Sequence, residues 1–264
     1  MTSKFALVIA NTDYEDNGLA QLTAPGRDAE DFAAVLKDQD ICAFDQVNIL
    51  LNQLSSTVTE AVHEFFDQKR PDDLLVMYFS GHGVRDEFGS LYFAVKNTIR
   101  SRLHSTAIRS DYIREAMERS RSKRLVLILE CCNSGAFSYG SRSSSALGER
   151  MRTGEAFGFG GNGCRIILAA TDSTQYAWEG NMVIGDTQNS LFTHFLINGL
   201  KGEADYDGDG KVSVDDLYDY AYEQVAKHTP RQTPSKWAHY QQGKIFLCEN
   251  LKPRGQRSNF EEHI

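Results

Sequence analysis

The chain has 264 residues, and its 28 Lys and Arg against 36 Asp and Glu give a formal net charge of −8 at pH 7. An acidic chain lacks the basic surface with which proteins bind nucleic-acid phosphates, so we predict no direct nucleic-acid binding. Hydrophobic residues make up 41% of the sequence, which is enough for a buried core and excludes a disordered chain. The apolar runs are far shorter than the ~20 residues that cross a bilayer, and the N-terminus has no signal peptide. We therefore expect a cytoplasmic protein that does not insert into a membrane.

Apolar runs alternate with stretches of helical periodicity along the chain. Strands are predicted at 5–10, 47–51, 74–79, 125–129, 165–170 and 244–247, with part of a hairpin at 91–95. Amphipathic helices are predicted at 26–37, 57–68, 111–121, 191–200 and 214–226. We expect 47–51 to be buried, and Ser55 or Ser56 to cap the helix that follows it. Because the strands are apolar throughout, the pattern predicts an α/β fold with a parallel sheet and helices on both faces.

Two further segments differ in composition from the rest of the chain. Residues 138–163 are rich in Ser and Gly and have no sustained periodicity, so we predict a long flexible loop there. The tail at 252–264 is charged and is predicted to be disordered. These assignments leave residues 1–251 as one domain.

The cysteines number five, an odd count, and form no C-x-x-C pair. This pattern argues against a disulfide framework and against a structural zinc site. We expect reduced thiols, as in a cytosolic protein. The residues are Cys42, Cys131, Cys132, Cys164 and Cys248.

Two polar clusters follow directly after predicted strands. They are Ser80–Gly83, which contains His82, and Glu130–Gly135, which contains Cys132. Because ligands bind beyond the carboxyl ends of parallel strands, we expect the clusters to meet at one site. A nucleophilic thiol needs an imidazole partner and backbone N–H groups that bind an oxyanion. The two clusters together therefore indicate cysteine-based hydrolysis.

The segments that carry these clusters resemble the histidine and cysteine loops of the caspase, metacaspase and paracaspase superfamily. They are Asp73–Val95 (DLLVMYFSGHGVRDEFGSLYFAV) and Arg124–Phe137 (RLVLILECCNSGAF), and the resemblance covers about residues 4–248. The simple domain plan is similar to that of bacterial members. The resemblance implies a caspase-like three-layer sandwich, with a mostly parallel six-stranded sheet and a peptidase domain over 1–251.

The same resemblance implies the chemistry. His82 would be the general acid and base, and Cys132, rather than Cys131, would be the nucleophile. The N–H groups of Gly83 and Cys132 would form the oxyanion hole. No cofactor is required for this reaction.

Acidic residues stand where the superfamily binds the side chain that precedes the cleaved bond. Caspases cut after Asp and hold it with arginines, whereas metacaspases and paracaspases cut after Arg or Lys and use carboxylates. Asp28 and Glu130 match acidic pocket positions of metacaspases, and Glu179 replaces a caspase arginine. A protein or peptide substrate with a basic residue is therefore implied, because carboxylates pair bidentately with a guanidinium. Asp172 and Trp178 are further candidates. Alternatively, the acidic residues Asp28, Glu130, Glu179 and Asp172 are solvated surface charges.

If the enzyme cleaves after basic residues, three arginines of the predicted flexible loop are candidate self-cleavage sites. Arg142, Arg150 and Arg152 follow the nucleophile, where family members often cut themselves. We predict self-cleavage there. The alternative is that these arginines are ordinary solubilising charges.

Residues 205–216 (DYDGDGKVSVDD) match the calcium loop of EF-hand proteins. Asp216 replaces the usual final Glu, which would weaken calcium binding or favour magnesium. We predict that the loop and its following helix, 203–227, bind calcium, which either braces the fold or gates activity; the alternative is a turn without metal. The expected ligands are Asp205, Asp207, Asp209, Lys211, Ser213 and Asp216.

These features predict a cysteine endopeptidase that cleaves after Arg or Lys through a Cys–His dyad and an acyl-enzyme thioester. Regulation is expected from metal, from self-processing or from a separate activating protein. One alternative is a catalytically weak caspase-fold regulator that binds a partner peptide in the same pocket. Another is a cysteine hydrolase of nucleotides or lipids, which explains the acidic pocket less well.

Overall fold

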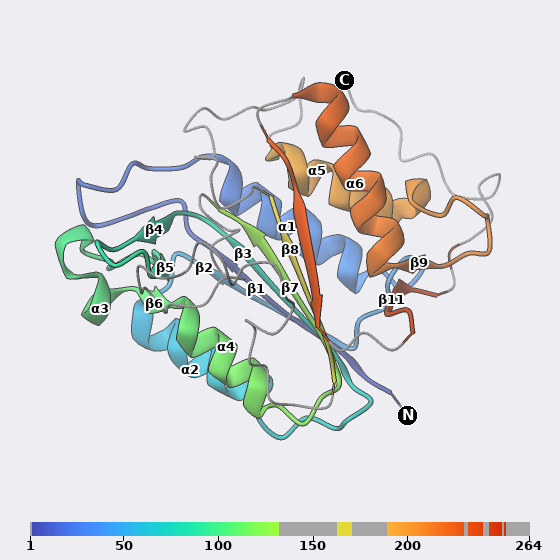
Figure 1. Cartoon of the computed structure of the whole chain (residues 1–264), viewed down its shortest axis with the longest axis horizontal. Coiled ribbons are helices and arrows are strands. Elements are labelled where there is room, and N and C mark those ends of the chain that lie inside the picture. The colour runs from blue at the N-terminus through green and yellow to red at the C-terminus, as the bar shows by residue number, and fades with distance from the viewer. Residues whose placement is uncertain are drawn as a thin grey trace, which may run out of the picture.

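A six-stranded sheet forms the centre of the molecule (Figure 1). The computed structural model describes residues 2–131, 163–170, 189–229, 232–239, 243–249 and 251. The strand order is β10–β8–β7–β3–β1–β2, in which β10 is antiparallel to β8 and the other pairs are parallel. The bounds are β1 Lys4–Ala10, β2 Gln46–Leu51, β3 Leu74–Ser80, β7 Arg124–Glu130, β8 Cys164–Ala169 and β10 Ser235–His239. The predicted mostly parallel α/β sheet is confirmed.

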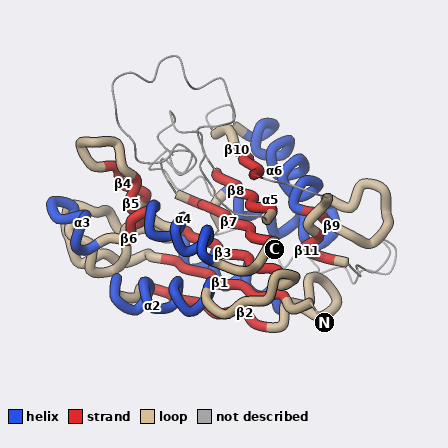
Figure 2. The backbone as a smooth tube through the Cα atoms, turned by 60° about the horizontal axis from the view of Figure 1, so that its bottom comes forward, coloured by secondary structure: helices blue, strands red, loops and turns tan. Residues whose placement is uncertain are grey.

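Helices cover both faces of the sheet (Figure 2). One face packs against α1 (Ala24–Lys37), α5 (Leu191–Asn198) and α6 (Val214–His228). The other packs against α2 (Ser55–Phe66) and α4 (Ser110–Arg119). Successive residues of β1 alternate between the two buried cores, and this explains why the strand is apolar along its length.

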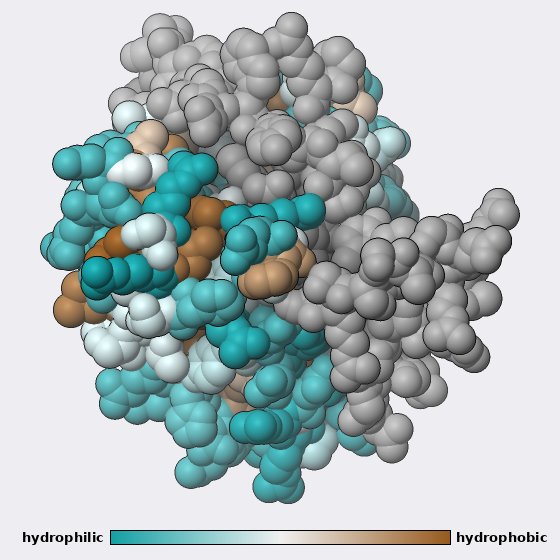
Figure 3. Space-filling model, turned by 60° about the vertical axis from the view of Figure 1, so that its left-hand side comes forward, coloured by the Kyte–Doolittle hydropathy of each residue, from teal (hydrophilic) through white to brown (hydrophobic). Residues whose placement is uncertain are grey.

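Two small sheets lie outside the central sheet. A three-stranded sheet contains β4 (Gly83–Arg85), β5 (Leu91–Phe93) and β6 (Ile108–Arg109), and a two-stranded one pairs β9 with β11. Figure 3 shows the side of the molecule that carries this hairpin, where brown hydrophobic side chains reach the surface among teal ones. The remaining elements are β9 Val212–Ser213, β11 Phe246–Cys248, α3 Leu103–Thr106, a 3-10 turn Arg100–Arg102 and a π-helical turn Gly199–Glu203.

The last strand of the central sheet was not predicted from the sequence. The expected strand at 244–247 instead contributes to β11, which pairs with β9 outside that sheet. The sixth position belongs to β10, whose sequence SKWAH lacks a continuous apolar run. An antiparallel edge strand needs less apolar surface than a central parallel strand, so the pattern gave no signal.

Two local predictions at the opposite edge are wrong. The strand predicted to be buried is the edge strand β2, in which Ile49 and Leu51 are 38% and 36% exposed. Ser55 is the first residue of α2, and its N-cap, Leu54, makes no side-chain hydrogen bond. The Ser55 N–H instead donates to Asn97 Oδ1 at 2.8 Å. A distant amide therefore replaces the predicted local serine cap.

The expectation of reduced cysteines is also wrong for one pair. Cys42, in the connection between α1 and β2, forms a disulfide with Cys248 of β11, across a sequence separation of 206 residues. Both side chains are buried. Cys131 and Cys164 are free and buried. An odd cysteine count excludes complete pairing but not a single bridge, and the fold decides which residues meet.

Within the described ranges, no helix is both long and apolar enough to cross a bilayer.

Candidate active site

His82 lies between the end of β3 and the start of β4, at the carboxyl end of the central sheet. Its Nε2 atom lies 2.8 Å from the carbonyl oxygen of Ala20. A carbonyl only accepts hydrogen bonds, so this contact places the ring proton on Nε2. The other ring nitrogen, Nδ1, is then the atom with a lone pair for a proton from a thiol. The arrangement suits the role of general base.

The end of β7, which precedes Cys132 in the sequence, lies beside the end of β3, which precedes His82. Ser80 and Glu130 are paired residues of β3 and β7, and the Gly81 N–H donates to the Glu130 carbonyl oxygen at 3.2 Å. His82 and Cys132 each follow this pair by two sequence positions. Cys132 itself lies outside the described residues. Cys131, which precedes it, is buried.

The structure brings Asp28 and Glu130 together at this end of the sheet. Asp28 is fully buried on α1, and its Oδ1 accepts the Ser190 N–H at 2.8 Å. Burial raises the pKa of Asp28 to about 6, although hydrogen bonds from Ser190, Asn189 and Ser80 oppose the shift. Burial and the nearby Asp28 charge raise the pKa of Glu130 to about 8. Neutral donors alone do not fully compensate the two carboxylates, so the Glu130 carboxyl keeps its proton near neutral pH, whereas Asp28 is mostly ionised.

A chain of hydroxyl groups supports Glu130 from within the core. The Thr193 hydroxyl on α5 donates to Glu130 Oε2 at 3.2 Å, and the Tyr78 hydroxyl lies 2.7 Å from Thr193 Oγ1. Because Thr193 gives its only hydroxyl proton to Glu130, Tyr78 donates to Thr193. Sequence reasoning missed Thr193 and Ser190. The signal was a threonine within an otherwise apolar helical face, at LFTHFLIN.

Three carboxylates of the acidic loop gather at the other side of the molecule. Oxygen atoms of Asp205, Asp207 and Asp209 lie within 4.8 Å of one another, and the first residue is buried whereas the other two are exposed. Gly208 and Gly210 have φ angles of 71° and 80°, which a residue with a Cβ adopts only with strain. These residues have the donor chemistry that calcium prefers.

The end of the loop is arranged differently from the start. Ser213 and Asp216 form a capping box at the first turn of α6, in which the Asp216 N–H donates to the Ser213 hydroxyl at 3.2 Å and the Ser213 N–H donates to Asp216 Oδ2 at 3.1 Å. The Ser213 hydroxyl also donates to Asp216 Oδ2 at 2.6 Å. The other carboxylate oxygen of Asp216 lies 3.4 Å from Lys244 Nζ. Burial alone would raise the pKa of Asp216, but the Ser213 hydrogen bonds and the Lys244 charge outweigh it and lower that pKa. Asp216 is not part of the three-carboxylate group in the described structure.

The sequence matches the caspase domain over residues 3–246. The chain belongs to the caspase-domain family. No curated protein matches the chain. Among solved structures, protein GSU0716 from Geobacter sulfurreducens has a TM-score of 0.63 and 15% identity, with 91% of this chain and 95% of that chain covered. Caspase-1 from Spodoptera frugiperda has a TM-score of 0.62 and 15% identity, with 93% and 90% covered. These similarities show the fold.

Several residues predicted for this caspase domain lie outside the described structure. They are the nucleophile Cys132, the pocket candidates Asp172, Trp178 and Glu179, and the self-cleavage candidates Arg142, Arg150 and Arg152. His82, Gly83, Asp28 and Glu130 are described, and all four lie at the carboxyl end of the caspase-fold sheet. The described part of the site therefore contains the candidate base and two candidate pocket carboxylates.

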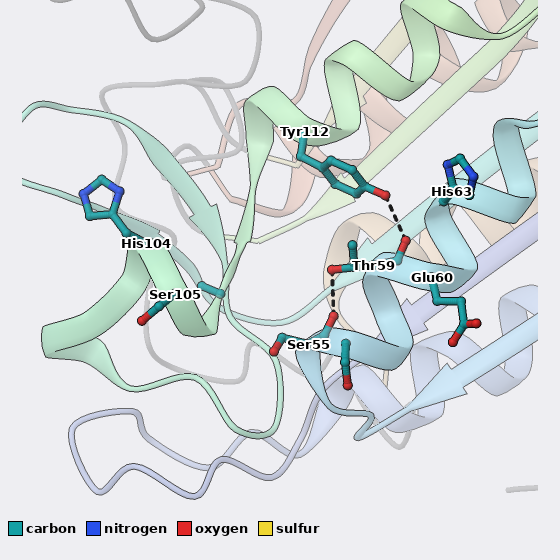
Figure 4. A pocket seen from close by; sticks show the side chains of 9 residues that line it. Ser55, Thr59, Glu60, His63, His104, Ser105 and Tyr112 are labelled. Atoms are coloured by element: carbon teal, nitrogen blue, oxygen red, sulfur yellow. Dashed lines mark hydrogen bonds between the residues drawn. The ribbon is translucent and has the colours of Figure 1, made fainter.

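An open hollow of about 640 Å³ lies elsewhere on the caspase domain, between α2, α3 and α4 (Figure 4). His63 and His104 line it, together with several hydroxyl groups. The Tyr112 hydroxyl donates to the Thr59 carbonyl oxygen at 2.9 Å across the helix pair. None of the candidate active-site residues lines this hollow. It is separate from the site at the carboxyl end of the sheet.

Proposed function

We propose that this caspase-domain protein is a cysteine endopeptidase that cleaves peptide bonds after Arg or Lys. The single observation that carries the proposal is the pair of raised-pKa carboxylates, Asp28 and Glu130, next to the strand end that bears His82. A guanidinium can replace the proton that Glu130 keeps near neutral pH and pair with both carboxylates. An aspartate side chain there would add a further negative charge and be rejected.

In the proposed reaction, His82 accepts the thiol proton at Nδ1 while its Nε2–H remains bonded to Ala20. The Cys132 sulfur attacks the peptide carbonyl carbon, and the oxyanion is held by the N–H groups of Gly83 and Cys132. His82 then donates the proton to the leaving amine, and a thioester remains on Cys132. Water hydrolyses this thioester, with His82 again acting as base.

A positional peptide library digested by the purified chain tests the proposal. We expect cleavage after Arg, less after Lys and none after Asp, and no cleavage by the Cys132→Ala variant. Cleavage after acidic residues would contradict the specificity. Binding of a basic peptide without turnover, with or without calcium, would instead favour the second candidate, a catalytically weak regulator that uses the same two carboxylates.

We further propose that the acidic loop binds calcium through Asp205, Asp207 and Asp209, with Lys211, Ser213 and Asp216 as the remaining candidates. The gathered carboxylates and the two glycines with positive φ support the first part of this ligand set. Because Asp216 is held by Ser213 and Lys244, its participation would require it to leave the capping box. A chelator titration followed by both activity and melting temperature separates gating from bracing.

Processing and activation are the remaining parts of the proposal. Self-cleavage is proposed at Arg142, Arg150 or Arg152, and mass spectrometry of the active chain beside Cys132→Ala tests it. A separate activating protein is proposed as a further trigger. Pull-down of that protein with the Cys132→Ala chain, followed by an activity assay, tests its role.

A cytoplasmic location would require Cys42 and Cys248 to be reduced, whereas their disulfide requires oxidation. Rapid alkylation of cell extracts before purification distinguishes the two states, since only free thiols are labelled.

A further inference from the structure

Tyr14 contacts His82 at both its main chain and its ring. The Tyr14 hydroxyl accepts the His82 N–H at 3.1 Å and donates to the Asn11 carbonyl oxygen at 3.1 Å. The two ring centroids lie 4.9 Å apart, with an angle of 43° between the ring planes. Tyr14 is only 5% exposed, so its ring is fixed by packing.

The neighbouring glycine is required by this arrangement. A Cβ on Gly81 would lie 2.9 Å from the Tyr14 hydroxyl oxygen, a distance that real Cβ atoms essentially never show. The absence of a side chain at Gly81 therefore lets the hydroxyl reach the His82 N–H. The glycine before the histidine and the tyrosine in the preceding loop fit each other.

The loop that carries Tyr14 also supplies the acceptor for the imidazole. The Gln21 side chain bonds both main-chain groups of Tyr14, accepting from N and donating to O at 2.9 Å each. Ala20, the residue before Gln21, provides the carbonyl oxygen for His82 Nε2. The loop that contains Tyr14 and Ala20 therefore contacts the main chain of His82, its imidazole ring and its Nε2 atom.

We propose that Tyr14 is a positioning residue for His82: its hydroxyl fixes the main chain and its ring restricts the imidazole to the orientation that leaves Nδ1 for the thiol. The inference rests on the proposed role of His82 as base. Tyr14 has no proton to exchange with substrate in this scheme. It acts through the histidine, and its removal should slow the reaction without changing the recognition of the basic side chain.

Charged groups near the histidine are held by other partners. In the loop, Asp13 accepts from Asn52 at 3.0 Å, and Asp16 accepts the Arg100 N–H at 2.6 Å. In the hairpin, Asp86 accepts from the Tyr92 hydroxyl at 3.2 Å. The remaining charged residues of these two segments are Glu15, Arg85 and Glu87. All of them are unchanged in the variants below, so differences between variants report on Tyr14.

The experiment compares Tyr14→Phe, which removes only the hydroxyl, with Tyr14→Leu, which also removes the ring. Tyr112→Phe is the matched control, because it removes a similarly bonded hydroxyl on the distant α2–α4 surface. The first readout is the rate at which iodoacetamide alkylates Cys132, measured by mass spectrometry from about pH 5 to about pH 9. In that reaction the thiolate sulfur bonds to carbon and iodide leaves, so no peptide substrate is needed. The second readout is kcat and KM on a peptide with Arg at the cleaved bond.

For Tyr14→Phe we expect Cys132 alkylation and kcat to fall about fivefold with KM unchanged, the effect of one lost hydrogen bond. Tyr14→Leu should lower both rates further and shift the pH midpoint of alkylation, because the aromatic ring no longer packs against the imidazole. Tyr112→Phe should match the unaltered chain, and melting curves should show that all variants fold.

Unchanged alkylation and kcat in both folded Tyr14 variants would overturn the inference, as would an effect on KM alone. If the chain cleaves no peptide but Tyr14→Phe still slows Cys132 alkylation, the proposed peptidase function fails and the inference about Tyr14 stands.

Discussion

The molecule contains two clusters of acidic residues that differ in their surroundings: Asp28 with Glu130, and Asp205 with Asp207 and Asp209. Asp28 is fully buried and Glu130 is half-buried, both receive hydrogen bonds from neutral groups, and desolvation raises the pKa of each. Two of the three loop carboxylates, Asp207 and Asp209, are instead exposed. Carboxylates in these two environments therefore favour different ligands. Glu130 keeps its proton near neutral pH until a matching cation replaces it, whereas exposed carboxylate oxygens suit a hydrated metal ion.

The largest effect is expected for Glu130→Gln, which removes the carboxylate that would pair with the bound guanidinium. We predict that kcat/KM for an Arg peptide falls by about a hundredfold to several thousandfold, since breaking a buried charge pair costs about 3–5 kcal/mol. The exposed Glu115→Gln on α4 is the control and should have no effect. A Glu130→Gln variant that keeps its Arg activity would show that the buried pair is not the specificity pocket.

The disulfide between Cys42 and Cys248 joins the acidic-loop side of the molecule to the connection after α1. We predict that Cys42→Ser lowers the free energy of unfolding by about 2–5 kcal/mol, because the bridge closes a long loop in the unfolded chain. Cys164→Ser, which removes a buried free thiol, is the control. Equal stability of oxidised and reduced protein in urea titrations would contradict this role.

Calcium should stabilise the exposed group and leave the buried pair unaffected. At a hundredfold excess over Kd, bound calcium adds about 2.7 kcal/mol to the free energy of unfolding. We expect Asp207→Asn to abolish this gain and Asp219→Asn, on α6 outside the loop, to retain it. A calcium-dependent rise in melting temperature that survives Asp207→Asn would place the ion elsewhere.

The ionisation of Asp28 and Glu130 should make the free energy of unfolding depend on pH. Asp28 and Glu130 bind protons more tightly in the folded than in the unfolded chain, so they favour folding at low pH. This contribution is lost as pH rises through about 6 for Asp28 and about 8 for Glu130. We predict that Glu130→Gln is more stable than the unaltered chain above pH 8, with a smaller difference near pH 5. Urea titrations at both pH values check this, and the reverse trend would contradict the assigned shifts.

Much of the fold followed from the apolar periodicity of the chain. Strands β1, β3, β7 and β8 are covered on both faces and therefore apolar throughout, which made them visible as continuous runs. Strand β10 was not predicted from the sequence because an edge strand needs no continuous apolar run. Strand β2 was misjudged as buried because its apolar residues remain partly exposed at the other edge.

The candidate site was predictable to the extent that its residues share short sequence segments. His82 and Glu130 follow apolar strands directly, and their residue types carry the chemistry. Tyr14, Ser190 and Thr193 contact these groups from loops and helices that are distant in sequence. A hydroxyl in the sequence does not indicate which carboxylate it will bond, because that depends on how the helices pack.

The sequence by itself determined the alternation of strands and helices, the family, the candidate base and nucleophile, and the acidic loop with its turn glycines. The tertiary structure decided the edges of the sheet, the pairing of Cys42 with Cys248, and the partners of each buried carboxylate. Local patterns record which side chains prefer burial or a turn. Protonation and orientation depend on the dielectric and the hydrogen-bond donors that distant segments bring to the same place.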